Sequence, residues 1–63
     1  MKYWVILTKG NTENAIKAFD NQSEAVAFGN DYFSKLNPGD GVLTVEGIQE
    51  GDANRRIVYG WHF

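Results

Sequence analysis

The sequence has 63 residues, a formal net charge of -2 and no cysteine. This length allows a single domain, residues 1–63, and excludes multi-domain designs and most enzymes. Without cysteine, a disulfide framework and thiolate chemistry are excluded as well. Apolar burial in a chain of this length contributes roughly 90 kcal/mol and ordering the chain costs roughly 95 kcal/mol, so a lone monomer is expected to be marginally stable.

The composition is that of a globular domain, with 43% hydrophobic and 22% charged residues. The sequence pI of about 5.1 argues against nucleic acid as a partner, because phosphate-binding domains usually carry a basic face. No apolar run approaches the ~20 residues of a membrane span, and the N-terminal run is too short for a signal peptide. We therefore expect a cytoplasmic protein that does not bind membranes.

The first elements are expected to form a β-hairpin. Residues 3–7 are an unbroken apolar run, which is typical of a central strand buried on both faces. Residues 9–14 contain no apolar side chain and predict a six-residue loop. Residues 15–19 are short enough for strand or helix, and we favour a second strand paired with the first.

A helix is expected next. Asn21 fits the N-cap position and Glu24 follows three residues later, as in a capping box. The positions predicted to share one apolar face are Ala25, Phe28, Gly29, Tyr32, Phe33 and Leu36. Gly29 weakens the helix, and we expect it to allow a close approach to the sheet. Residues 37–41 contain Pro38 and two glycines, which predicts the end of the helix.

Two further strands are expected in the C-terminal third. Residues 42–46 alternate as a strand does, and Gly47 suggests a bulge that moves Ile48 to the core side. Residues 50–54 predict a second hairpin loop, and residues 56–63 predict the last strand. Its alternation predicts that Ile57, Tyr59, Trp61 and Phe63 face the core and that Arg56, Val58, Gly60 and His62 face outward.

The predicted fold class is α+β, a two-layer ββαββ domain in which one helix packs on a four-stranded, mostly antiparallel sheet. The apolar first strand and the aromatic last strand look central, which predicts the strand order 2-1-4-3. This order of elements is similar in general outline to small bacterial and phage domains, and the similarity implies no functional residues.

Catalysis and metal binding find little support in the sequence. His62 is the only histidine, and Ser23 and Ser34 are explained by their places at the start and on the surface of the helix. Four carboxylates surround the second hairpin, but the segment 50–54 lacks the length and closing glutamate of a calcium loop. No glycine-rich phosphate motif is present. We therefore expect no catalytic residue, no metal and no cofactor.

One surface carries a functional hypothesis. A single helix covers one face of a four-stranded sheet, so the other face should expose apolar side chains with a charged rim, which is typical of partner surfaces. Alternatively, such scattered apolar residues are normal for an antiparallel sheet. The candidate partner-binding residues are Trp4, Ile6, Lys17, Val42, Thr44, Arg56, Val58 and His62.

We therefore expect a small non-enzymatic interaction module that self-associates or binds a protein partner through this outer face or an edge strand. One alternative is a single-stranded nucleic-acid binder that uses sheet aromatics, with Trp4, Lys17, Arg55 and Arg56 in contact. Another alternative is an acidic regulator, like small phage inhibitors, that presents Glu46, Glu50 and Asp52 to a basic partner.

Overall fold

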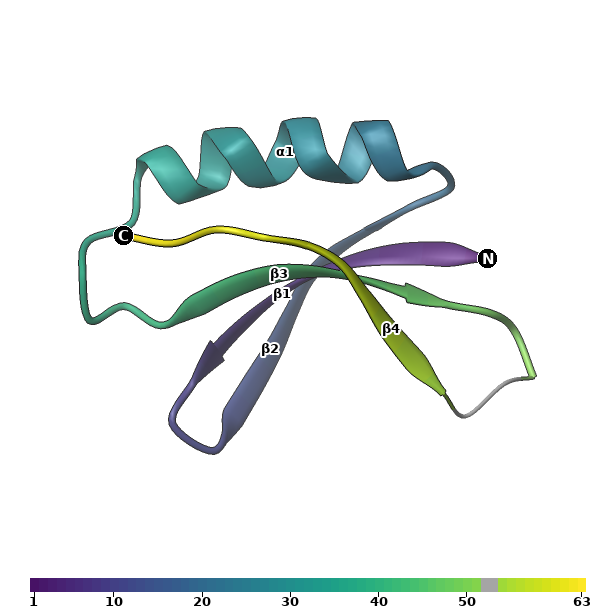
Figure 1. Cartoon of the computed structure of the whole chain (residues 1–63), viewed down its shortest axis with the longest axis horizontal. Coiled ribbons are helices and arrows are strands. Elements are labelled where there is room, and N and C mark those ends of the chain that lie inside the picture. Colours follow the sequence, from purple (N-terminus) through teal and green to yellow (C-terminus); the bar gives the residue numbers. More distant parts are fainter. Residues whose placement is uncertain (52–53) are drawn as a thin grey trace.

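The fold is a four-stranded antiparallel sheet with one helix across one of its faces (Figure 1). The computed structural model describes residues 1–51 and 54–63. Its elements are β1 (Lys2–Lys9), β2 (Thr12–Phe19), α1 (Gln22–Ser34), β3 (Val42–Ile48) and β4 (Arg55–Gly60). This arrangement confirms the predicted two-layer ββαββ class.

The strand order is β2-β1-β3-β4, so the predicted order 2-1-4-3 is wrong. β1 is central, as expected, but its second neighbour is β3 rather than the aromatic last strand. β3 is central because Leu43 and Val45 fill the middle of the core and are fully buried. The last strand is an edge, and its Ile57 side chain is 65% exposed. Aromatic alternation therefore did not mark a central strand here.

The first hairpin is tighter than the sequence suggested. Lys9 pairs with Thr12, so Gly10 and Asn11 alone form the turn in place of the expected six-residue loop. Gly10 has a φ of 60°, a conformation that glycine adopts without steric cost and that suits a two-residue hairpin. The polar residues 12–14 are strand because an exposed edge strand tolerates polar side chains.

The helix begins where the capping pattern predicted. Asn21 is the N-cap, and its Oδ1 accepts a hydrogen bond from the Glu24 backbone N–H at 2.8 Å. Glu24 Oε1 in turn accepts from Asn21 Nδ2, rather than from the Asn21 backbone as in the standard capping box. The stripe from Ala25 to Leu36 packs toward the core, with Ala25 and Gly29 buried.

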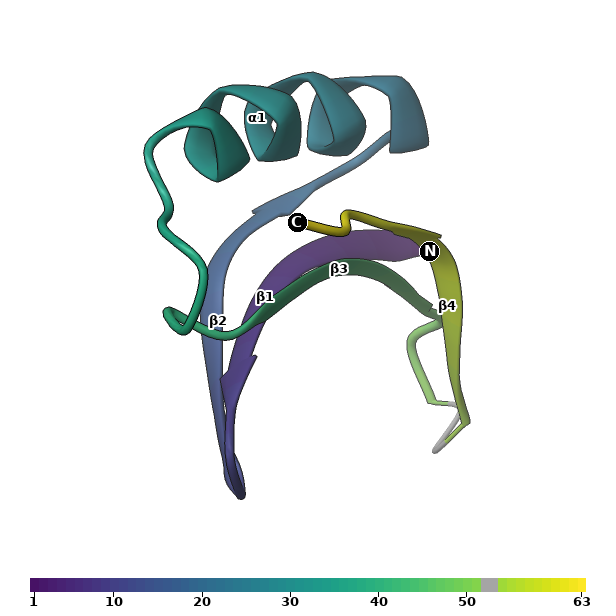
Figure 2. The ribbon, with the colours of Figure 1, turned by 60° about the vertical axis from the view of Figure 1, so that its left-hand side comes forward.

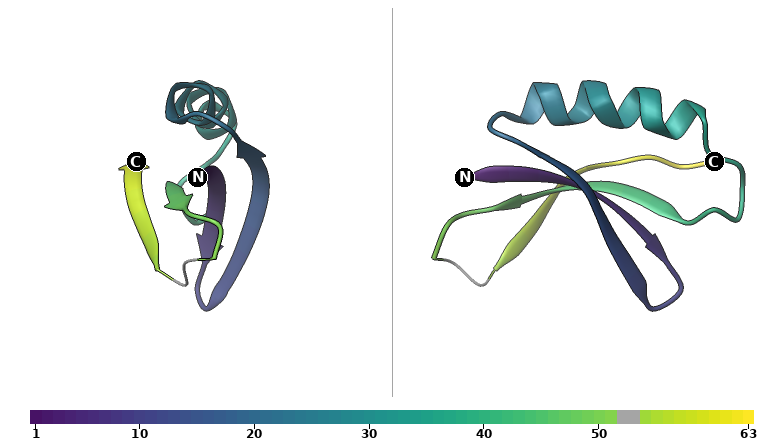
Figure 3. Two further views of the ribbon diagram at one scale, coloured as in Figure 1. Left: turned by 90° about the vertical axis from the view of Figure 1, so that its right-hand side faces the viewer. Right: turned by 180° about the vertical axis from the view of Figure 1, so that it is seen from behind.

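The core lies between α1 and the middle of the sheet. Val5, Ala25, Leu43 and Val45 are fully buried and contact one another. Partly buried apolar side chains surround this cluster: Tyr3, Leu7, Ile16, Phe19, Val26, Phe28, Tyr32, Phe33, Leu36, Val58 and Trp61. α1 packs mainly on β1, β2 and β3, and the left view of Figure 3 shows β4 at the edge of the sheet opposite β2.

The segment after β4 returns under the helix. The Trp61 backbone N–H donates to the Leu43 carbonyl at 3.1 Å, and the indole Nε1–H donates to Asn30 Oδ1 at 2.7 Å. Gly29 makes this possible, because a Cβ at that position would overlap the Trp61 ring. The predicted role of Gly29 in close packing is confirmed, although its neighbour is the Trp61 indole.

Two bulges set which residues of the edge strands face the helix. In β2 the register shifts opposite Val5 and Ile6, which leaves Ile16 unmatched. In β4 the register shifts opposite Val45 and Glu46, which leaves Val58 unmatched. The bulge expected at Gly47 and Ile48 is therefore wrong in position.

Candidate functional site

Cross-strand pairing identifies the residues on the sheet face away from α1, which we call the open face. Directly paired residues share a face, so each row of partners can be followed across the sheet. Two rows cross the open face: Ala18, Trp4, Glu46 and Ile57; and Ala15, Ile6, Thr44 and Gly60. Val42, paired with Thr8, lies on the same face. Trp4, Ile6, Val42 and Thr44 are thus where the sequence placed them.

Three predicted members of this surface lie on the helix side instead. Lys17 pairs with Val5, and its ammonium lies over the rings of Phe19 and Phe28 at 5.3 Å and 5.6 Å from their centroids. The bulge at Ile16 causes this inversion, because one extra residue exchanges the two faces of a strand.

The second bulge has the same effect on β4. Arg56 pairs with Gly47, which lies in the helix-side row with Tyr3, and Val58 packs against the core. Ile57 was expected in the core but pairs with Glu46 on the open face. Tyr59 and Phe63 were also expected in the core, yet they are 43% and 57% exposed. His62 follows β4 and is exposed, as expected.

The open face is largely closed, contrary to the expectation of an exposed apolar patch. Ile6 is only 4% exposed, Trp4 is half-buried, and Glu46 is buried although it is charged. Figure 2 shows the reason: the sheet arches, with its two hairpins descending on the side away from α1. The right-handed twist and coiling of strands produce such curvature.

An ionic contact spans this arch. The Arg55 guanidinium donates to both oxygens of Glu13, at 3.0 Å and 3.1 Å, and its Nε lies 3.2 Å from Glu46 Oε1. Arg55 belongs to β4 and Glu13 to β2, so the contact joins the two edge strands. We call these three residues the Arg55 clamp.

The clamp requires a strongly curved sheet. Arg55 is in the row of Lys2, whereas Glu13 pairs with Thr8, six residues further along β1. In a flat sheet the two positions would be about 25 Å apart, from the usual rise per residue and strand spacing. Two extended side chains cannot cover that distance, so the ion pair forms only because the sheet is curved.

The electrostatic state of the clamp follows from its geometry. Hydrogen bonds from Arg55, together with its positive charge, hold the pKa of Glu13 below the ordinary value of 4.5. The hydrogen bond to Glu13, and the charges of Glu46 and Glu13, raise the pKa of Arg55. Glu13 is thus ionised and Arg55 protonated at neutral pH. Sequence reasoning missed this contact, because no local pattern connects residues 42 positions apart.

The exposed apolar side chains gather elsewhere. Within residues 1–51 and 54–63, the large apolar side chains most open to solvent are Met1, Val42, Ile57, Tyr59 and Phe63. Three of them, Ile57, Tyr59 and Phe63, lie on β4 or just after it, and we call these three the β4 surface. Ile57 is on the open face of this edge strand and Tyr59, paired with Val45, is on its helix side. Phe63 contacts Phe33 at 4.6 Å between ring centroids, and Tyr59 meets the edge of Trp61 at 4.8 Å. The β4 surface is therefore partly ordered by aromatic contacts.

The residues of the two alternative functions are dispersed. For the nucleic-acid alternative, Trp4 and Arg55 lie on the open face and Lys17 and Arg56 on the helix side. For the acidic-regulator alternative, Glu46 is buried within the clamp and Glu50 is exposed in the second hairpin. Asp52 lies outside the described residues, as does part of the loop compared with a calcium site.

Metal binding and membrane crossing would each need a particular arrangement of the described residues. Among them, no group of three or more His, Cys, Asp or Glu side chains is placed to hold a metal ion. The described residues contain no helix that is long and apolar enough to cross a membrane. No family model, curated protein or solved structure matches the chain.

Proposed function

We propose that this chain is a small non-enzymatic interaction module that self-associates by pairing β4 with β4 of a second copy. The observation that supports this proposal is that exposed apolar side chains lie on an edge strand, Ile57 and Tyr59, and just after it, Phe63. An edge strand presents backbone donors and acceptors that a further strand can satisfy. Apolar side chains beside those groups add burial to the hydrogen bonds.

The other edge of the sheet is less suited to such pairing. β2 is exposed over most of its length, but the exposed side chains are polar, charged or small. Glu13 is held in the Arg55 clamp, and Lys17 lies over two rings. Charged and polar residues on an edge strand oppose association with another strand. The contrast favours β4 as the interface.

A second copy is a fitting occupant because antiparallel pairing of β4 with itself avoids like charges. Arg55 and Arg56 stand at the beginning of β4, and residues 57–61 that follow carry no charge. In an antiparallel pair the beginning of one strand lies opposite the end of the other, so the arginines of one copy face neutral residues of its partner. A twofold axis, the commonest symmetry of homo-oligomers, relates the two strands.

The marginal stability of the monomer supports the same proposal. The structure exposes 4331 Å², slightly more than the roughly 4,100 Å² expected of a chain of this mass. Burying about 600 Å² more per subunit would add a favourable contribution of order 10 kcal/mol before the costs of association.

The proposal is tested by sedimentation velocity at micromolar concentration. We expect a dimer for the natural sequence and a monomer for Ile57→Lys, because the new charge would be buried at the interface. Val42→Lys is the matched control: Val42 is similarly exposed, at 55%, but lies on a central strand, so this variant should remain dimeric. A monomeric natural sequence, or equal effects of the two lysines, would overturn the proposal.

A further inference from the structure

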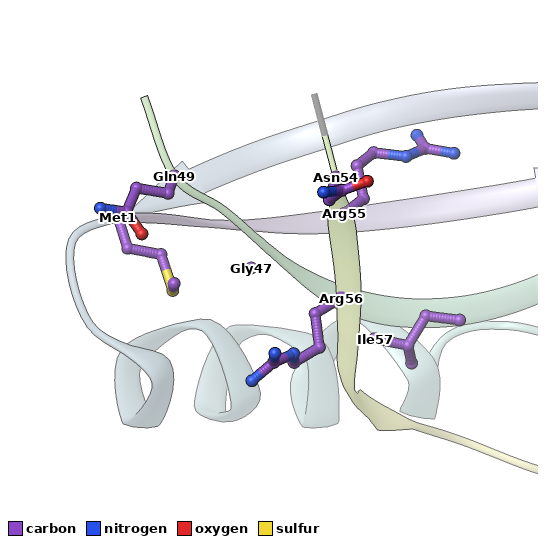
Figure 4. A pocket seen from close by; sticks show the side chains of 7 residues that line it. All are labelled: Met1, Gly47, Gln49, Asn54, Arg55, Arg56 and Ile57. Atoms are coloured by element: carbon purple, nitrogen blue, oxygen red, sulfur yellow. The ribbon is translucent and has the colours of Figure 1, made fainter. Parts of the chain in front are cut away.

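A cavity lies at the end of the second hairpin, on the part of β4 farthest from the helix contacts. Its volume is about 740 Å³, and Met1, Gly47, Gln49, Arg56 and Ile57 are among its lining residues. Figure 4 shows these side chains around an open space, with Arg56 extending toward α1 and Arg55 in the opposite direction. Polar and apolar groups thus meet in one concavity.

The cavity has a clear origin in the cross-strand pattern. The helix-side row that crosses the sheet at this level consists of Phe19, Tyr3, Gly47 and Arg56. Gly47 supplies no side chain between Tyr3 and Arg56, so the row is interrupted there. A Cβ on Gly47 would lie 3.2 Å from Met1 Sδ and 3.5 Å from the Tyr3 ring, which shows how closely these groups border the space.

Within residues 1–51 and 54–63, no acidic side chain pairs with the Arg56 charge at this cavity. Lys2 pairs with Asp20, Lys35 with Asp31, and Arg55 with Glu13 and Glu46. The Arg56 side chain makes no hydrogen bond or ion pair with any described residue. None of the described lining residues is acidic. In a chain of net negative charge, one guanidinium beside a concave surface therefore has no acceptor among the described residues.

We propose that this cavity binds a small monocarboxylate with an apolar body. The planar guanidinium of Arg56 matches a carboxylate with two parallel hydrogen bonds, and the Gln49 amide can donate a further one. The thioether of Met1 offers a soft apolar contact for the body of the ligand. A single charge suits the site, because the neighbouring Arg55 is already neutralised by two carboxylates.

This site does not rest on self-association, since Arg56 points to the helix side and not along the free edge of β4. The two proposals can therefore fail separately. Carboxylate binding is measured by NMR shifts and self-association by sedimentation, so the loss of one in a variant is distinguishable from the loss of the other.

The test is an NMR titration of the ¹⁵N-labelled chain with benzoate, in which backbone and arginine Nε–H signals are followed. We expect saturable shifts at Gly47, Arg56 and Ile57. Arg56→Gln should weaken the affinity roughly ten-fold, as expected for loss of charge-assisted hydrogen bonds, and Arg56→Lys should weaken it less. Lys9→Gln is the matched control, because it removes a cation in the first hairpin, and it should bind benzoate as the natural sequence does.

Two further ligands sharpen the result. Benzamide has the same apolar body without the charge and should cause no saturable shifts at these positions. Inorganic phosphate has the charge without the apolar body and should bind more weakly than benzoate. The proposal would be overturned if benzoate caused no saturable shifts or if benzamide caused equal ones. It would also be overturned if Arg56→Gln kept the affinity of the natural sequence or if phosphate bound more tightly than benzoate.

Discussion

The two faces of the sheet are closed by different physical means. On the helix side, Val5, Leu43 and Val45 are buried by the side chains of α1, and the contacts are apolar. On the open face no second layer is present among the described residues; Ile6 is buried on the inside of the arch, and the Arg55 clamp joins the two edge strands there. Solvent conditions should therefore affect the two faces differently: apolar packing is insensitive to pH and salt, whereas an ion pair at the surface responds to both.

The largest expected effect is on the helix side. Leu43→Ala removes a fully buried side chain at the centre of the core and should lower the free energy of unfolding by about 2–4 kcal/mol. In a domain of this size such a loss is a large part of the total stability. Urea unfolding followed by circular dichroism measures it. Val42→Ala, at an exposed neighbouring position, is the control, and equal losses in the two variants would contradict the assignment of the core.

The next effect concerns the contact between the helix and the returning C-terminal segment. Gly29→Ala would place a methyl group where the Trp61 ring lies, and the overpacking should cost about 1–3 kcal/mol although alanine is the better helix former. The Trp61 indole N–H signal in an NMR spectrum should shift as its hydrogen bond to Asn30 is lost. Ala27, exposed on the same helix, provides the control: Ala27→Gly should leave that signal in place.

The smallest effect should come from the open face, and it should depend on pH. The pKa of Glu13 is lowered on folding, so its contribution to stability is present above the ordinary value of 4.5 and is lost as the pH falls through the lowered value. The natural sequence should therefore be more stable than Glu13→Gln at pH 7, and the difference should shrink as the pH falls below about 4.5. Urea unfolding at several pH values measures the difference.

High salt provides a second test of the stability difference between the natural sequence and Glu13→Gln. Added salt should reduce the same difference at pH 7, because the clamp residues are partly exposed. A difference between the natural sequence and Glu13→Gln that is constant across pH would contradict the role assigned to the clamp. Lys2 lowers the pKa of Asp20 as well. This pair is present in the natural sequence and in Glu13→Gln alike, so its contribution to stability cancels when the two are compared.

The sequence predicted what depends on local chemistry. Asn21 and Glu24 located the start of the helix because capping involves neighbours three residues apart, and Gly29 was correctly linked to close packing. The class of fold followed from the periodicity of the apolar residues. Alternation along the first strand also placed Trp4 and Ile6 correctly on the open face.

The sequence could not predict what depends on register. Single-residue bulges at Ile16 and Val58 moved Lys17 and Arg56 to the helix side. A prediction from simple alternation assumes that no strand has an extra residue, so it assigned both to the wrong face. Ile6 is buried on the inside of an arch, across which Arg55 and Glu13 from opposite edges form an ion pair. Such long-range geometry determines whether a correctly placed apolar residue is open to a partner.

The bulge at Val58 also limits how far an assembly can grow. Where β4 carries an unmatched residue, its spacing of donors and acceptors is interrupted, so an added strand can follow it regularly only for a few residues. β2, the opposite edge, has its own bulge and a lysine within its length. In the proposed self-association, a sheet that accepts a neighbour on one short edge and discourages one on the other would form a closed pair of molecules and would not extend into a fibre.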